Sequence, residues 1–132
     1  MNDEEKQILE SAKTIAVVRL SDKRDRRSFQ ISHYMQEHGY KIIPVNPNIT
    51  EALGEKAYPN LKDIPEKVDI VDIFRRSEDV PPIVDEAIAI KARAVWMQEG
   101  IVNETAASKA EAAGLKVIMN RCIMVTHYHL IG

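Results

Sequence analysis

The stretch that decides the fold begins Ile15-Ala16-Val17-Val18 and runs through Arg19 and a basic turn into residues 28–38. Its first four residues are apolar without alternation, which is typical of a strand buried on both faces of a parallel sheet. Residues 28–38 repeat their large side chains at i, i+3, i+4 and i+7, the helical period, and Gly39 follows as a common helix end. This stretch therefore predicts a buried strand followed by a helix.

The same unit recurs along the chain, because further apolar runs alternate with helical patterns. The helical patterns begin near Ser77 and at Asn103, and the second ends at Gly114. Strands that alternate with helices predict an α/β fold, a doubly wound sheet of about five parallel strands with helices on both faces. The further apolar runs span residues 42–45, 70–74, 94–97 and 115–119.

Other segments depart from this alternation. Residues 1–13 precede the first strand, and we expect an N-terminal amphipathic helix there. Residues 46–67 contain three prolines and a glycine, which predicts an irregular crossover with a short strand or a turn of helix. The two histidines of His127-Tyr128-His129 follow the last strand, and we expect this end of the chain to fray. We interpret residues 1–132 as one domain.

Composition narrows the classes of function. The chain has 132 residues, with 18 Lys and Arg against 20 Asp and Glu, a formal net charge of −2. This balance attracts neither nucleic acid nor an anionic membrane, and no apolar run approaches the roughly 20 residues that span a bilayer. Cys122 is the single cysteine, so an internal disulfide is excluded. The acidic start, Met1 to Glu5, is unlike a signal peptide. We expect a cytoplasmic protein that binds neither nucleic acid nor membranes.

The turn after the first strand is basic. Residues 23–27 hold four cations and one anion, a local charge of +3, just before a helix whose first N–H groups can bind an anion. In a wound sheet, ligands bind beyond the carboxyl ends of the strands. The turn has no glycine, and Asn46-Pro47 follows the second strand in place of an acidic residue, which argues against NAD and against a P-loop. The pattern favours another phosphate-bearing ligand over a merely solvated turn.

Asp72 raises a different interpretation, a phosphate-accepting receiver domain. Such a domain has a similar size and strand pattern, and its acceptor aspartate lies near the end of a central strand, as Asp72 does. Its Mg²⁺ site also requires acidic residues at the end of the first strand. This chain has Arg19 there, and a cation in place of the required anions argues against a receiver.

Four segments stand in order at the strand ends: Ile42-Ile43-Pro44-Val45-Asn46-Pro47-Asn48, Val68-Asp69-Ile70-Val71-Asp72-Ile73-Phe74-Arg75-Arg76, Ala94-Val95-Trp96-Met97-Gln98-Glu99-Gly100-Ile101 and Asn120-Arg121-Cys122. Together they resemble the small stand-alone CoA-binding proteins. That family is similar to the N-terminal CoA-binding domain of the succinyl-CoA synthetase alpha subunit and of ADP-forming acyl-CoA synthetases. The resemblance covers residues 8–129 and implies a Rossmann-like fold with coenzyme A or an acyl-CoA lying across the strand ends.

The resemblance also implies a role for each matching position. Cations and helix N–H groups would hold the CoA phosphates, an amide and a proline would lie by the adenosine, and an aromatic ring with a guanidinium would stack on the ligand. The positions are Leu20, Ser21, Lys23, Arg26 and Ser28 for the phosphates, Asn46 and Pro47 for the adenosine, Ile73, Phe74 and Arg75 for the wall against adenine or pantetheine, and Gln98 and Gly100 beside the pantetheine arm.

This sequence departs from the family pattern at three positions. Arg19 replaces a glycine that lets the backbone turn tightly, and the arginine either adds a phosphate contact or obstructs the site. Arg27 replaces a proline and adds charge. Lys91 stands where the family often has a glycine that ends the third helix, and a left-handed conformation there costs about 1 kcal/mol.

No set of residues supplies a nucleophile, a base and an acceptor together. Ser21 has no evident base beside it, Cys122 either packs as an inert thiol or meets the CoA thiol, and two histidines at positions 127 and 129 make a poor zinc site. We therefore predict binding without catalysis and no metal. The alternatives are a regulatory or protein-interaction module with a degenerate nucleotide site, or a small enzyme acting on acyl-CoA. A homo-oligomer is compatible with each of these.

Overall fold

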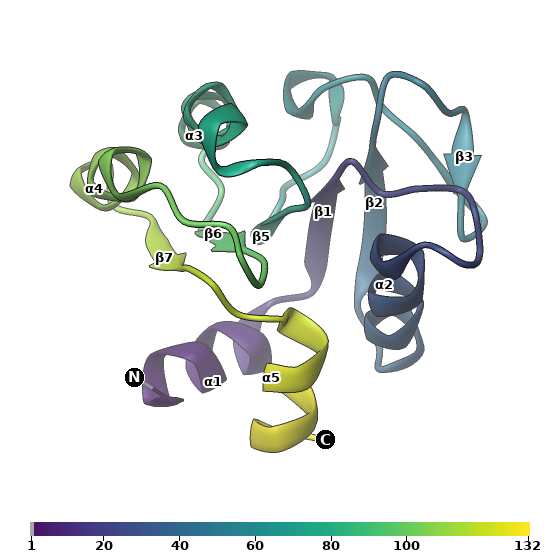
Figure 1. Ribbon diagram of the computed structural model, residues 1–132, viewed down its shortest axis with the longest axis horizontal. Coiled ribbons are helices and arrows are strands. Elements are labelled where there is room, and N and C mark those ends of the chain that lie inside the picture. The colour runs from purple at the N-terminus through teal and green to yellow at the C-terminus, as the bar shows by residue number, and fades with distance from the viewer. Residues whose placement is uncertain (1) are drawn as a thin grey trace.

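The computed structural model describes residues 2–132. Its main sheet has five strands in the order β2-β1-β5-β6-β7 (Figure 1), and every neighbouring pair is parallel. The α/β, doubly wound, Rossmann-like fold predicted from the sequence is thus confirmed. The strands are β1 (Thr14–Val18), β2 (Lys41–Val45), β5 (Ile70–Ile73), β6 (Ala94–Met97) and β7 (Lys116–Ile118).

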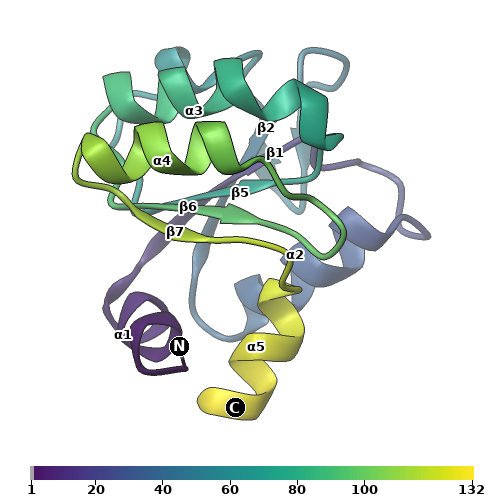
Figure 2. The ribbon, with the colours of Figure 1, turned by 60° about the vertical axis from the view of Figure 1, so that its left-hand side comes forward.

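Helices cover both faces of this sheet, as Figure 2 shows. Side chains that alternate along each buried strand enter two separate cores, so Ala16 and Val71 pack on one side while Val17 and Ile70 pack on the other. Helices α3 and α4 cover the first face, and α1, α2 and α5 cover the second. The helices are α1 (Asn2–Ser11), α2 (Arg27–Glu37), α3 (Val80–Ala89), α4 (Glu104–Ala112) and α5 (Ile123–Leu130).

The helix ends follow the local sequence. The side chain of Asn103 accepts a hydrogen bond from the N–H of Ala106 at 2.9 Å, which caps α4. Helix α1 occupies most of the segment 1–13 predicted to be helical, and residue 1 lies outside the described residues. Lys91, after α3, has φ of +60°, the left-handed conformation that the family glycine would favour. No helix among residues 2–132 is long and apolar enough to cross a bilayer.

The irregular crossover 46–67 contains both kinds of element expected there. A two-stranded hairpin joins β3 (Glu51–Ala52) to β4 (Glu55–Lys56), and a turn of 3₁₀ helix, η1, spans Leu61–Asp63. Between them, the backbone N–H of Asn46 donates to the Tyr58 carbonyl at 2.9 Å, and Tyr58 bridges Val45 in parallel. The crossover therefore extends the edge of the sheet beside the end of β2.

The C-terminal segment corrects one prediction. Residues expected to fray form α5, in which His127 is buried against α2 with its Nδ1 3.0 Å from the Tyr34 hydroxyl. Burial, with a smaller contribution from His38, holds the pKa of His127 below its usual value. Leu130 and Ile123 stand seven residues apart on one helical face, a signal that could have indicated this helix. His129, by contrast, is exposed, and no cluster of three metal-ligating side chains occurs among residues 2–132.

Candidate functional site

The strand order reverses between β1 and β5. From β1 the chain goes to β2 on one side, and it then returns to place β5 on the other side of β1. The connections therefore diverge at the carboxyl ends of β1 and β5, which is where wound sheets form a ligand crevice. Each of these strands is followed by a residue that bonds to the neighbouring strand end: the N–H of Arg19 donates to the Val45 carbonyl at the end of β2 at 2.7 Å, and the N–H of Phe74 donates to the Val18 carbonyl at the end of β1 at 3.1 Å.

The basic turn between β1 and α2 holds itself in place through two serines. The Oγ of Ser28 accepts from the N–H of Ser21 at 3.0 Å, and the Oγ of Ser21 accepts from the N–H of Lys23 at 3.0 Å. Arg26 occupies the position before α2 and offers no side-chain cap. The first N–H groups of an uncapped helix, next to exposed cations, make a favourable place for a phosphate.

The cations of this turn are largely uncompensated. Within the described chain, no carboxylate lies within 4 Å of Lys23, Arg24 or Arg26. The exception is Arg27, whose Nη2 lies 3.4 Å from the Oε1 of Glu99, in the loop after β6. Both of these side chains are exposed, so the pair joins the start of α2 to the loop after β6 at little energetic gain.

Two pockets open along this carboxyl edge. The first, of about 190 Å³, lies toward β2 and η1, and the second, of about 540 Å³, lies toward β6. Arg75 lines both and separates them. Its Nη2 lies 3.1 Å from the Oδ2 of Asp79, which fixes its position. The first pocket includes Arg19, Pro47, Asn60, Ile83 and Glu86, and the second includes Arg27, Phe74, Gln98, Glu99 and Ile101.

The residues predicted for the site divide into two groups. Pro47, Phe74, Arg75 and Gln98 line the pockets, while Lys23 and Arg26 lie exposed on the basic turn. Others turn inward: the side chains of Leu20 and Ile73 are fully buried in the core, so only their backbones face the crevice. Asn46 and Gly100 form hydrogen bonds within the loops. The Asn46 amide donates to the Leu20 carbonyl at 3.1 Å and accepts from the N–H of Asn48, and the N–H of Gly100 donates to Asn120 Oδ1.

The structure adds residues that sequence reasoning missed. Asn60 lines the first pocket, and its Oδ1 is buried without a hydrogen-bond partner in the described chain. Glu86 lines the same pocket and accepts from the N–H of Leu61 at 2.9 Å. Proline at position 59, just before Asn60, marked an irregular segment but gave no sign that the segment would fold back to the end of β2.

A buried carboxylate lies in the sheet beneath the second pocket. Asp72 is 1% exposed, in register with Val17 and Trp96 in the middle of the sheet. Its Oδ1 accepts from the Nε2 of Gln98 at 2.6 Å, and Gln98 is itself buried. Burial raises the pKa of Asp72 to about 7, although the Gln98 hydrogen bond works in the opposite direction. The pair stabilises the floor of the site and ties the end of β6 to β5.

The fold defines a Rossmann-like α/β domain. The chain matches the model of the CoA binding domain family over residues 13–128 and belongs to that family. It is 50% identical over 122 residues to the Bacillus subtilis protein YneT. The aligned region covers 92% of this chain and 90% of YneT. A solved structure, a hypothetical protein from Pyrococcus horikoshii OT3, superposes with a TM-score of 0.96 at 39% identity, covering 100% of this chain and 93% of that one.

Larger enzymes contain a related segment. An ADP-forming acetate–CoA ligase II from Archaeoglobus fulgidus is 36% identical over 76 residues, which is 56% of this chain but 11% of the ligase. The sequence resemblance to the CoA-binding domain of acyl-CoA synthetases is thus confirmed. The likeness to the ligase concerns a small part of that enzyme.

Proposed function

We propose that this protein binds coenzyme A or an acyl-CoA at the carboxyl edge of its sheet, as a single cytoplasmic domain without catalysis of its own. The observation that carries the proposal is the pairing of an uncapped helix N-terminus, ringed by unpaired cations, with two partly apolar pockets at the switch between β1 and β5. Membership of the CoA binding domain family supports the same ligand.

The arrangement fits the parts of the ligand. CoA carries a diphosphate, an adenosine and a long pantetheine arm. The diphosphate would meet the turn from Ser21 to Ser28, where Lys23 and Arg26 are free to contact it. The adenosine would enter the pocket lined by Pro47, and the pantetheine arm would follow the longer pocket past Phe74 and Gln98. Leu20, Ile73 and Gly100 would contribute backbone groups.

Catalysis has little support from the arrangement. Cys122, which could have met the CoA thiol, is buried in the core under α5, so it is placed to pack rather than to react. The acids at the crevice are already engaged: Glu86 accepts from the Leu61 N–H, Glu99 pairs with Arg27, and Asp72 accepts from Gln98 inside the sheet. We therefore propose a binding role.

Isothermal titration tests the ligand. We expect heat of binding with CoA and with acetyl-CoA at micromolar protein, and none with NAD. The absence of heat with both CoA and acetyl-CoA would contradict the proposal. Turnover of acetyl-CoA that is lost on changing Cys122 or Ser21 would instead favour an enzyme, and a partner bound equally with and without CoA would favour an interaction module.

Arg26→Ala tests the place of the phosphates. Removing a charge-assisted hydrogen bond to a phosphate should weaken CoA binding by about 1.5–3 kcal/mol. Since the Arg26 side chain is exposed and unpaired, stability should stay unchanged. Lys6→Ala, an exposed cation on α1, is the matched control and should leave affinity as it was. Equal affinities for both variants would remove Arg26 from the site.

A further inference from the structure

Arg19 holds an unfavourable backbone conformation at the centre of the crevice. Its φ is +71°, in the left-handed region that costs a side chain about 1 kcal/mol relative to glycine. The hydrogen bond from its N–H to the Val45 carbonyl, at 2.7 Å, holds this conformation between β1 and β2. Non-glycine residues persist in such conformations where the surrounding structure imposes them, often at ligand sites.

The guanidinium of Arg19 is half-buried and uncompensated. It lines the 190 Å³ pocket, yet across residues 2–132 it makes no ion pair or side-chain hydrogen bond. The two other charged groups of the pocket have partners, because Arg75 pairs with Asp79 and Glu86 accepts from the backbone of Leu61. A partly desolvated guanidinium without an acceptor is a ready partner for an anion.

The rest of this pocket fits a nucleoside. Val18, Val45, Pro47 and Pro59 supply apolar walls, which suit the faces of a base. The Oδ1 of Asn60, buried without a partner, can accept from an exocyclic amine at the base edge. The pocket therefore presents walls for a ring, an acceptor for an amine and a free cation for a phosphate.

Arg19 lies apart from the cations of the turn before α2. In the proposed binding mode the 5′-diphosphate lies on the basic turn before α2, while Arg19 lines the pocket on the β2 side. A phosphate reaching Arg19 must then be a second one, carried by the ribose of the adenosine. Coenzyme A has such a phosphate at its 3′ position, whereas dephospho-CoA and ADP lack it.

We propose that Arg19 is a specificity-determining residue that binds the 3′-phosphate and makes the site select 3′-phosphorylated adenosine ligands over their dephospho forms. This inference rests on the proposed function. Two arginines then share the pocket, with Arg19 free to bind the phosphate and Arg75 held by Asp79 as a wall.

Titrations of CoA and dephospho-CoA into the wild type, Arg19→Gly and Arg24→Gly test this. The wild type should bind CoA at least about tenfold more tightly than dephospho-CoA. Arg19→Gly should lose most of this preference by weakening CoA alone, with dephospho-CoA unchanged. Arg24→Gly, a neighbouring exposed cation, should keep the preference. Because glycine suits the backbone at position 19, Arg19→Gly should unfold at the same or a higher temperature, which separates lost binding from lost folding.

Three results would overturn the inference. Equal affinities of the wild type for CoA and dephospho-CoA would do so and leave the proposed function standing. Tighter CoA binding by Arg19→Gly would show that the arginine obstructs the pocket. A wild type that binds neither ligand would contradict the proposed function itself, and the inference with it.

Discussion

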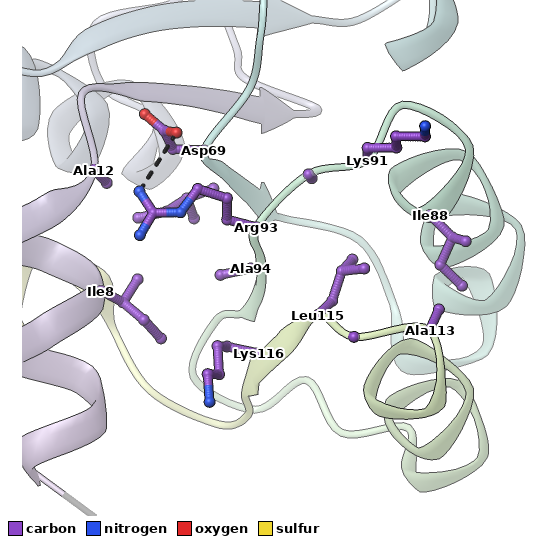
Figure 3. A pocket seen from close by; sticks show the side chains of 13 residues that line it. Ile8, Ala12, Asp69, Ile88, Lys91, Arg93, Ala94, Ala113, Leu115 and Lys116 are labelled. Atoms are coloured by element: carbon purple, nitrogen blue, oxygen red, sulfur yellow. Dashed lines mark ion pairs between the residues drawn. The ribbon is translucent and has the colours of Figure 1, made fainter.

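The two edges of the sheet differ in how many of their charged side chains are paired. At the amino edge, a pocket of about 370 Å³ lies between α1 and the ends of α3 and α4. Figure 3 shows Ile8 and Ala12 on one side of it and Leu115 on the other, with Arg93 and Lys116 between them in this view. In volume it falls between the two pockets of the carboxyl edge, of about 190 and 540 Å³.

Apart from Lys91, the charged residues that line the amino-edge pocket are paired within the fold, and Lys116 lies 3.7 Å from Glu4. Arg93 lies 3.6 Å from Asp69 and donates to the carbonyl and hydroxyl of Ser11, and Asp69 accepts from the N–H groups of Lys13 and Thr14. At the carboxyl edge, Arg19 and the cations before α2 have no such partners among the described residues. A cluster of unpaired charges therefore distinguishes the edge of the proposed site, because a group that the fold already pairs offers a ligand little.

Asp72→Asn should produce the largest effect. The folded-state pKa of Asp72 is raised to about 7 from 3.8, so its contribution to stability is fully present below pH 3.8 and lost as the pH rises through about 7. Replacing it should make the protein more stable at pH 8, by roughly 2–4 kcal/mol, with a much smaller gain at pH 5. Urea unfolding at both pH values measures this. Asp63→Asn, an exposed control, should show no such pH dependence. A gain in stability of Asp72→Asn that is the same at both pH values would contradict the raised pKa of Asp72.

Asp69→Ala should separate the two edges. The substitution leaves the N–H groups of Lys13 and Thr14 without their acceptor and frees Arg93, which should lower the free energy of unfolding by about 2–3 kcal/mol. CoA affinity should stay within about twofold, because the amino edge lies away from the proposed site. Urea unfolding and titration of the same preparation check both statements, with Asp85→Ala, in an exposed ion pair with Lys109, as the control. A loss of CoA affinity in the folded variant would break the distinction.

Glu99→Gln should have the smallest effect. Its pair with Arg27 is exposed, with side chains 63% and 70% accessible, so stability should change by less than about 0.5 kcal/mol. The freed arginine should strengthen CoA binding slightly, by about twofold, since an anion that competes with the phosphates is gone. Glu66→Gln, which breaks the exposed pair with Lys41 at the amino edge, should leave affinity alone. Weaker CoA binding by Glu99→Gln would show that the pair shapes the site.

Local patterns predicted the elements better than the site. Continuous apolar runs placed all five strands, because burial on both faces requires them, and Asn103 marked the start of a helix through its own side chain. The inward turn of Leu20 and Ile73 was not predicted, although both lie at strand ends that face the crevice. Helix α5 was missed as well, since its burial of His127 depends on contact with Tyr34, 93 residues away.

The sequence by itself determined the strands, the basic turn, the left-handed strain expected at Lys91 and the family to which the chain belongs. Only the tertiary structure decided which polar groups remain free for a ligand. Asn46 is hydrogen-bonded to Leu20, Gln98 is hydrogen-bonded to Asp72, and Arg27 is paired with Glu99. Among residues 2–132, the Arg19 side chain and the Oδ1 of Asn60 have no such partner, and both residues line one pocket. The physical reason is that periodicity records burial along one element, while the pairing of polar groups depends on which distant strand ends the sheet order brings together.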